Sequence, residues 1–330
     1  MSLRGYTIIR ELGKGSFGTT YLVKSTDNNN LLYALKHFTF PEHNPNNYAT
    51  AKRLFQREVA ILQTLNGNAQ IPDFIDYWEE HQEYYLVQEF LSGDLLRKEL
   101  KEDEKSEADV VEFLTEILAI LQVIHDKKII HRDINPNNIM RRSCERQLVL
   151  IDFGAGAIRK FVKNTTLTQL QTPPTIIYTP GYAPIEQIQG HPEFNSDIYA
   201  VGIIAIQMLT GIEPHDVQMD ENGEIIWRSQ LQVSEHLANI LTTMVRYDYR
   251  SQYQCVDKVL EDLLTGYHTP TQILPSKTNL APSPSSSTRN PIYVILFCLL
   301  AGLSTIAILS AAGILPVNQP CNQQQQGRMI

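Results

Sequence analysis

The sequence predicts an α+β protein of two lobes, in which an antiparallel sheet comes first and a larger set of helices follows. Strand-like runs occupy much of residues 6–90 and surround a glycine-rich turn. Two long stretches with helical character, residues 108–125 and 197–209, lie beyond them. Because ligands commonly bind between two such bodies, we expect a cleft where the lobes meet.

The strand-like runs are Tyr6–Leu12, Thr19–Lys24, Leu31–Phe38 and Tyr84–Phe90. Before the fourth run, residues 51–65 carry apolar side chains close to helical spacing, at Leu54, Val59, Ile61, Leu62 and Leu65. That spacing predicts one helix in the first lobe. Residues 108–125 form an apolar stripe, and residues 197–209 are mostly apolar, which predicts a helix buried in the second lobe.

The composition is that of an ordinary globular protein and excludes a wholly disordered chain. Of 330 residues, 43% are hydrophobic and 19% are charged. The formal net charge is −8. Broad nucleic-acid binding draws its affinity from neutralised phosphates, so we expect no nucleic-acid partner. A small basic pocket for a single nucleotide is compatible with this charge.

The last sixty residues differ from the rest. Residues 292–315 carry no charge and lie between Pro291 and Pro316. As a helix they would be about 36 Å long, enough for a hydrocarbon core of about 30 Å, so we expect one transmembrane helix. The alternative is a helix buried in a protein core. Residues 269–291, rich in Pro, Ser and Thr, are predicted to be a linker, and residues 316–330 a short polar tail.

The charges beside the apolar segment predict its orientation. Lys277 and Arg289 precede it and only Arg328 follows, which favours a cytoplasmic side for the preceding domain. The first residues also lack the apolar region of a secretory signal. We therefore expect a single-pass protein of the cell membrane. Small residues four apart, Ala301 with Thr305 and Ala307 with Ala311, would suit a homodimer through the same helix, although such pairs also arise by chance.

The glycine-rich turn is Gly13-Lys14-Gly15-Ser16-Phe17-Gly18. Glycines let backbone N–H groups approach phosphate oxygens without side-chain obstruction. A dinucleotide-binding motif would continue directly into a helix, whereas here a strand-like run follows. The turn therefore predicts a flap between two strands, with a plain hairpin turn as the alternative.

A lysine ends the third strand-like run, in the sequence Ala34-Leu35-Lys36. A cation that points into a cleft could bind two phosphates and pair with a carboxylate. Glu58, on the helix that follows, is a suitable partner. The alternative is an ordinary solvated strand end.

The strongest motif is His131-Arg132-Asp133-Ile134-Asn135-Pro136-Asn137-Asn138, followed by Asp152-Phe153-Gly154. Phosphoryl transfer needs a carboxylate to orient the attacking hydroxyl, and oxygen ligands for Mg²⁺. Asp133 suits the first task. Asn138 and Asp152 suit the second. Two unrelated polar loops are the alternative, which the combination with the glycine-rich turn and Lys36 makes improbable.

Residues 6–265 resemble the catalytic domain of protein kinases, specifically the eukaryotic-like Ser/Thr kinases of bacteria. The resemblance implies the bilobal protein-kinase fold over residues 1–268. It also implies ATP between the lobes and Mg²⁺, or Mn²⁺ in its place, with Ser/Thr hydroxyls of proteins as acceptors. Asp133 would be the catalytic base, Lys36 and Asn135 would act beside it, and Asn138 and Asp152 would hold the metal.

The same resemblance implies a nucleotide site with Gln88 as its gatekeeper. The residues expected to bind the nucleotide are Leu12, Gly13, Lys14, Gly15, Gly18, Thr20, Ala34, Lys36, Glu58, Glu89, Leu91 and Met140.

Several further residues resemble internal anchors of the family. Glu186, which ends a motif that begins at Tyr178, would form a buried ion pair with Arg250. His131, Phe153, Leu62 and Asp197 would stack or anchor inside the molecule. Arg132 would read a phosphate on one of the threonines between Asp152 and Glu186: Thr165, Thr166, Thr168, Thr172, Thr175 and Thr179. An unregulated, solvated loop is the alternative.

One departure from the family bears on activity. Asn135 stands where the Ser/Thr kinases usually have lysine, so a donor is kept and a charge is lost. The first hypothesis is an active, membrane-tethered protein kinase that phosphorylates itself. The second is a pseudokinase, a nucleotide-binding scaffold on the membrane. The third is a small-molecule phosphotransferase that shares the fold.

Overall fold

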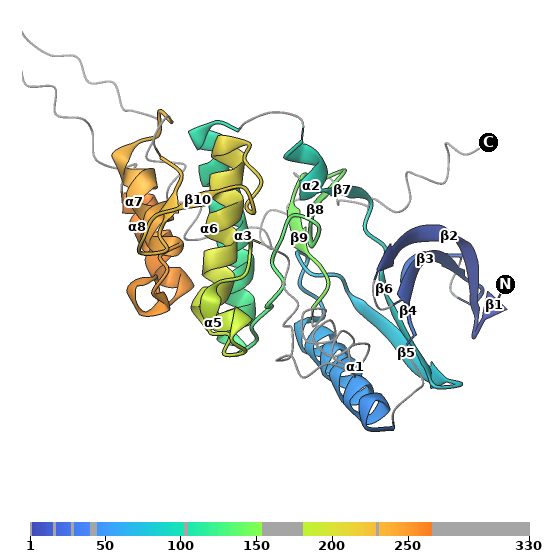
Figure 1. Ribbon diagram of the computed structural model, residues 1–330. Helices are drawn as coiled ribbons and strands as arrows, with labels where there is room; N and C mark the ends of the chain where they lie inside the picture. Colours follow the sequence, from blue (N-terminus) through green and yellow to red (C-terminus); the bar gives the residue numbers. More distant parts are fainter. Residues whose placement is uncertain are drawn as a thin grey trace, which may run out of the picture. The chain divides into compact units, whose positions relative to one another are not determined.

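The computed structural model describes residues 2–15, 18–27, 30–39, 45–101, 105–153, 181–228 and 231–265. They belong to one compact unit of the chain. A six-stranded antiparallel sheet and one helix form the first lobe, and helices dominate the second (Figure 1). The predicted two-lobed α+β architecture is confirmed.

The large sheet has the order β1-β2-β3-β4-β6-β5, and every neighbouring pair is antiparallel. Its strands are β1 (Ser2–Leu3), β2 (Tyr6–Gly15), β3 (Gly18–Ser25), β4 (Leu32–Phe38), β5 (Phe74–Glu80) and β6 (Glu83–Glu89). Helix α1 (Pro45–Leu65) packs on this lobe through Phe55, Val59 and Leu62. It begins before residue 51, where the apolar spacing starts.

The two faces of the large sheet are buried differently, because side chains alternate along a strand. On β6, Tyr84 and Leu86 join the core with α1, whereas Tyr85 and Val87 join a second cluster. On the face of that second cluster the rings of Tyr6, Trp78 and Tyr85 stack in sequence and continue to His37, with centroids 6.0, 4.9 and 4.5 Å apart. This aromatic stack crosses β2, β5, β6 and β4.

The helical lobe is built around two long helices. These are α3 (Glu107–Asp126) and α6 (Phe194–Thr210). The lobe also contains α7 (Glu235–Met244), α8 (Val256–Thr265) and the short helices α2 (Leu96–Glu99) and α5 (Ile185–Ile188). A 3₁₀ turn covers Tyr249–Ser251, and a hairpin pairs β10 (Gln218–Met219) with β11 (Ile225–Ile226). Residues 195–209 of α6 are buried throughout, as their apolar sequence predicts.

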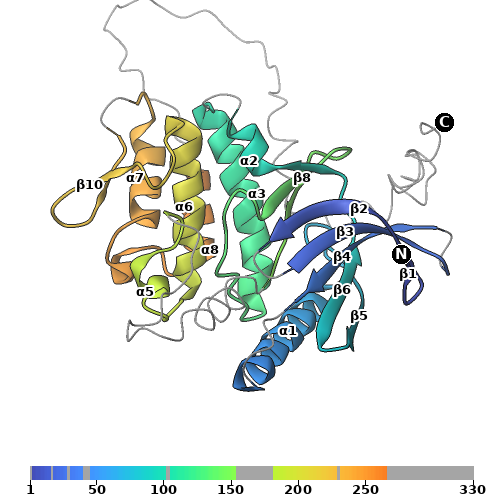
Figure 2. The ribbon, with the colours of Figure 1, turned by 45° about the vertical axis from the view of Figure 1, so that its right-hand side comes forward.

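A three-stranded sheet completes this lobe. It has the order β7 (Gly93–Leu95), β8 (Ile139–Arg142) and β9 (Leu148–Leu150). In two views it lies between α3 and the large sheet (Figure 1 and Figure 2). Strands of three or four residues carry too little alternation to be predicted from sequence. The strand β8 matters below, because it follows directly after the motif of residues 131–138.

The predicted linker, membrane segment and tail, residues 269–330, lie outside the described residues, as do the threonines from Thr165 to Thr179. Within the ranges that the structure describes, none of the helices is both long and apolar enough to cross a membrane.

Candidate active site

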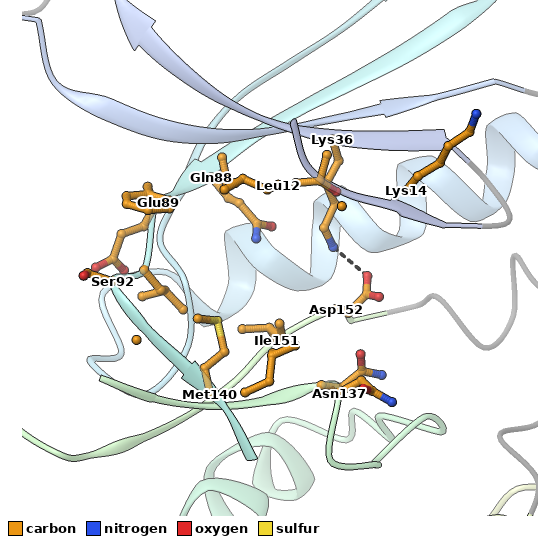
Figure 3. Close-up of a pocket in the computed structure, with 18 of the residues that line it drawn as sticks. Leu12, Lys14, Lys36, Gln88, Glu89, Ser92, Asn137, Met140, Ile151 and Asp152 are labelled. Carbon is orange, nitrogen blue, oxygen red and sulfur yellow. Dashed lines mark hydrogen bonds and ion pairs between the residues drawn. The ribbon is translucent and has the colours of Figure 1, made fainter. Parts of the chain in front are cut away.

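A pocket of about 620 Å³ lies between the lobes. Strands β2, β3 and β4 contribute one wall, and the segment after β6 and the strand β8 contribute the others (Figure 3). The predicted nucleotide-binding residues that line it are Leu12, Gly13, Lys14, Thr20, Ala34, Lys36, Glu89, Leu91 and Met140, together with the predicted metal ligands Asn138 and Asp152. Gly15, Gly18 and Glu58 are not in the lining.

The pocket also contains residues that the motifs did not single out. Ile151 and Ser92 line it, as do Arg10, Phe90, Gly93, Leu95 and Asn137. Ile151 ends an apolar run that leads directly into Asp152, so its position next to the motif was a usable signal. Asn137 lies inside the motif of residues 131–138 but had no role assigned to it, and the others carry no pattern of their own.

Gly18 has a structural reason to be glycine. Its φ is +147°, and a Cβ at this position would lie 1.8 Å from the carbonyl oxygen of His37. No other residue fits where β3 approaches β4 so closely. Gly13 differs, because nothing lies within 4 Å of the position of its missing Cβ. It lines the open pocket instead.

Lys36 reaches two carboxylates from β4. Its Nζ lies 2.6 Å from Asp152 Oδ1 (Figure 3). The same Nζ lies 3.5 Å from Glu58 Oε1, which confirms the expected contact with α1. Burial alone would lower the pKa of Lys36, but the charges of Asp152 and Glu58 outweigh it and raise that pKa. The lysine is therefore a cation at the end of the pocket.

Glu58 is buried more deeply than its partner, with 1% of its surface exposed. Burial raises the pKa of Glu58 to about 7; Lys36 opposes this rise, and the nearby Asp152 adds to it. The contact between α1 and the pocket is thus sensitive to protonation near neutral pH.

The loop of residues 131–138, which carries the predicted base Asp133, holds the Asp133 carboxylate through two asparagines. Asn138 Nδ2 donates to Asp133 Oδ2 at 2.9 Å and to the Asp133 carbonyl at 2.7 Å. Asn135 Nδ2 donates to the same carbonyl at 3.0 Å and to Oδ1 at 3.3 Å. Asn135 Oδ1 also accepts from the N–H of Asn137 at 3.0 Å. Asn135 therefore holds the loop together through hydrogen bonds on both sides of its amide, beside the carboxylate of Asp133.

Asp197 anchors this loop to α6. Its carboxylate accepts the backbone N–H groups of His131 and Arg132, at 2.8 and 2.9 Å, and lies 3.0 Å from His125 Nε2. Arg132 has a φ of 69°, which directs two consecutive N–H groups to one acceptor. The rings of His131 and Phe153 pack with their centroids 4.8 Å apart. The expected internal stacking and anchoring at these residues is confirmed, and Leu62 lies in the same buried cluster as Phe153.

The predicted ion pair between Glu186 and Arg250 is wrong. Arg250 lies on the 3₁₀ turn with its side chain 75% exposed, and its guanidinium binds Asp248, 2.9 Å away. Glu186 is buried, and its Oε1 accepts from Ser196 Oγ at 2.6 Å. Its Oε2 has no hydrogen-bond partner among the residues that the structure describes. Burial raises the pKa of Glu186.

The donor set suits Mg²⁺ held together with a nucleotide. Asn138 and Asp152 offer an amide and a carboxylate, the oxygen ligands that Mg²⁺ prefers, and both line the pocket. The described residues contain no group of three or more His, Cys, Asp or Glu side chains arranged to hold a metal alone. Further ligands would come from phosphates and water, as is usual for Mg²⁺.

Comparison with known proteins places this geometry in a family. The protein kinase domain matches residues 6–269. Serine/threonine-protein kinase PknA of Nostoc sp. is 38% identical over 269 residues, which are 79% of this chain and 47% of that protein. Serine/threonine-protein kinase B of Synechocystis sp. is 36% identical over 263 residues, 78% of this chain and 46% of that protein. The chain thus spans about half the length of these relatives.

Solved structures show the same fold at lower identity. The kinase domain of Mycobacterium tuberculosis PknI superposes with a TM-score of 0.59 at 19% identity, covering 80% of this chain and 97% of that one. The apo form of PpkA-294 gives a TM-score of 0.63 at 21% identity, with the same coverage. The chain belongs to the protein kinase family.

Proposed function

We propose that this protein is an ATP-dependent Ser/Thr protein kinase. One observation carries the proposal: Lys36, Asn138 and Asp152 line a single pocket, and Asn138 binds the carboxylate of Asp133 directly. A cation, two metal-type ligands and a candidate base therefore lie at one place. The relatives above bear the names of Ser/Thr kinases, which supports proteins with Ser/Thr hydroxyls as substrates.

In the proposed reaction, the acceptor hydroxyl attacks the γ-phosphorus of ATP. A new O–P bond forms, the bond from the γ-phosphorus to the β,γ-bridging oxygen breaks, and the hydroxyl proton passes to the carboxylate of Asp133. Asn135 and Asn138 hold that carboxylate in one orientation from two sides. Fixed geometry of this kind is the main contribution a protein makes to phosphoryl transfer.

The pocket would bind the adenine between Ala34 of β4 and Met140 of β8, with Leu12 beside it. The ammonium of Lys36 would then lie near the phosphates, held in place by Glu58. Mg²⁺, bound by Asn138 and Asp152, would supply positive charge at the phosphate oxygens.

Regulation by phosphorylation of the chain itself is part of the proposal. The guanidinium of Arg132 is half-buried, and its Nε has no hydrogen-bond partner among the described residues. Burial and the nearby charge of Arg57, on α1, lower the pKa of Arg132. The charge of Arg57, in the other lobe, thus acts on Arg132, and a phosphothreonine close to both would neutralise the two cations.

We also propose that residues 292–315 tether the kinase to the cell membrane, with the domain on the cytoplasmic side. The uncharged length of this segment and the flanking charges support the proposal. A homodimer through the same segment would bring two kinase domains together for mutual phosphorylation.

The test uses the full chain in detergent micelles with Mg²⁺, γ-labelled ATP and a generic protein acceptor. We expect label on Ser or Thr, located by mass spectrometry. Asp133→Ala should abolish transfer and leave nucleotide binding within about twofold, because the lost base acts on the hydroxyl only. Lys36→Met should weaken both phosphoryl transfer and nucleotide binding.

Three results would contradict the proposal. Transfer that persists in Asp133→Ala would remove the assigned base. A wild-type protein that binds ATP without labelling itself or the acceptor would favour the pseudokinase scaffold. Labelling of a small molecule in place of proteins would favour the third hypothesis.

A further inference from the structure

Arg142, the last residue of β8, binds the segment that leads from the sheet lobe to the helical lobe. Its Nη1 donates to Glu89 Oε1 at 2.8 Å, and its Nη2 donates to Glu89 Oε2 at 3.2 Å. Both side chains are largely buried, 20% and 26% exposed. A two-pronged, charge-assisted pair of this kind fixes orientation as well as distance. Nη2 also donates to the carbonyl of Ala69 at 3.1 Å.

The other end of the same segment is attached to the same place on β8. Gly93 lies opposite Arg142 in the ladder between β7 and β8, and the N–H of Ser143 donates to the carbonyl of Ser92 at 2.9 Å. The two strands approach so closely that a Cβ on Gly93 would lie 2.2 Å from the carbonyl oxygen of Arg141. Residues 89–93 are therefore held at both ends by residues 142–143.

All five residues of this segment line the nucleotide pocket, whereas Arg142 does not. Residues 90–92 belong to no helix or strand, so their path depends on how the ends are held. Met140, two residues before Arg142 on β8, lines the pocket as well. In Figure 3, Glu89, Ser92 and Met140 lie on the same side of the pocket, away from Lys36. A shift between β8 and the segment would thus move two walls of the pocket.

The preceding arginine offers a natural contrast. Side chains alternate along a strand, and Arg141 binds acids of the helical lobe: its Nε donates to Glu99 at 3.0 and 3.2 Å, and its Nη1 lies 3.6 Å from Glu116. None of these three residues lines the pocket. Both arginines are half-buried and paired on one short strand, and only the side chain of Arg142 binds a residue of the pocket's wall.

We propose that Arg142 is a positioning residue for the nucleotide. Through its paired hydrogen bonds to Glu89 it holds residues 89–93 in the shape that receives the base of ATP. The inference rests on the proposed function, since it requires a nucleotide in this pocket. It assigns to Arg142 an effect on nucleotide affinity without contact with the nucleotide.

The test compares Arg142→Met with Arg141→Met in the full chain, by calorimetric titration with ADP and Mg²⁺ and by steady-state kinetics. For Arg142→Met we expect the Kd of ADP and the KM of ATP to rise about tenfold, with kcat changed by less than about twofold, because binding geometry is lost and the reacting groups are intact. For Arg141→Met we expect both constants to stay within about twofold of wild type.

Two further variants separate positioning from stability. Arg142→Lys keeps the charge but loses the parallel hydrogen bonds, so its Kd should lie closer to that of Arg142→Met than to wild type. Glu89→Gln combined with Arg142→Met should weaken binding no more than the stronger single change, because the two residues act as one unit. Amide hydrogen exchange should accelerate at residues 89–93 in Arg142→Met and not in Arg141→Met.

An Arg142→Met protein with the wild-type Kd, or an equal rise in Arg141→Met, would overturn the inference and leave the proposed kinase activity intact. A wild-type Kd in Arg142→Lys would also overturn the role of the paired hydrogen bonds. A wild-type protein that binds no nucleotide would overturn the inference and the proposed function together.

Discussion

Asp197 and Glu186 are both buried carboxylates of the helical lobe, and their surroundings differ. Asp197, on α6, accepts two backbone N–H groups and lies 3.0 Å from a histidine nitrogen. Glu186, on α5, accepts one serine hydroxyl, and its second oxygen has no hydrogen-bond partner among the described residues. The two side chains are equally hidden from solvent, 1% and 4% exposed.

The difference shows that the position of the partner along the chain decides whether a buried carboxylate is fully hydrogen-bonded. The acceptors of Asp197 are used by backbone N–H groups of the loop of residues 131–138, so the loop conformation and the anchor form together. The expected partner of Glu186 would have to come from a distant turn, and that turn directs Arg250 into solvent, toward Asp248. A buried carboxylate without a cation takes up a proton more readily, and the pKa of Glu186 is raised accordingly.

Removing the well-satisfied carboxylate should have the largest effect. Asp197→Ala leaves two buried N–H groups without an acceptor, so we expect the free energy of unfolding to fall by about 3–5 kcal/mol. Transfer should also be lost, because the loop that carries Asp133 is no longer fixed. Urea denaturation and a transfer assay measure both. A loss below about 1 kcal/mol would show that the backbone holds the loop without this carboxylate.

Glu186→Gln should have a smaller effect that depends on pH. In the folded protein the pKa of Glu186 is raised above the ordinary value of 4.5. The protonated side chain therefore stabilises the fold fully at a pH below 4.5, and this stabilisation is lost as the pH rises through the raised pKa. Burial is the main cause. Glu193 also raises this pKa, and Ser196 opposes it. Burial raises the pKa of Tyr199 to about 12, and the charge of Glu186 adds to this rise.

We therefore expect the free energy of unfolding of Glu186→Gln, measured relative to that of wild type, to be lower near pH 5 than at pH 8. At pH 8 the variant should be at least as stable as the wild type. Urea midpoints of both proteins at several pH values give the measurement. A difference that stays constant across this range would mean that Glu186 does not change its protonation there.

Arg250→Ala should have the smallest effect of the three. Its guanidinium is exposed and binds a single neighbouring carboxylate on the surface, an arrangement that contributes little. We expect the thermal midpoint to match that of wild type. A loss comparable with that of Asp197→Ala would revive the ion pair with Glu186 and remove the contrast between the two carboxylates.

Much of the fold follows from sequence patterns that are local. Apolar spacing marks α1 and α3, a mostly apolar run marks α6, and strand-like runs mark β2, β3, β4 and β6 of the large sheet. Strands β8 and β9 form a short local hairpin, whereas β7 pairs with β8 from far away along the chain. No local pattern encodes such a pairing.

The same division runs through the site. Lys36, Asp133, Asn138 and Asp152 stand in motifs, so their neighbourhood could be predicted. The bond between Arg142 and Glu89 joins residues 53 positions apart and leaves no trace in either local sequence. For Asn135 the sequence shows only that a neutral amide stands where the Ser/Thr kinases usually have a charged lysine. Its hydrogen bonds to Asp133 and Asn137 follow from the geometry of the loop, which the sequence does not give.

The aromatic stack on the large sheet gives the protein a natural optical label. The chain has two tryptophans. Trp78 lies in the stack between Tyr6 and Tyr85, and Trp227 is buried in the cluster that includes α6 and α7. Each lobe thus holds one tryptophan. In a protein that carries Trp227→Phe, the remaining tryptophan emission comes from the sheet lobe alone, and in one that carries Trp78→Phe it comes from the helical lobe, so the melting of the two lobes can be followed separately without attached dyes.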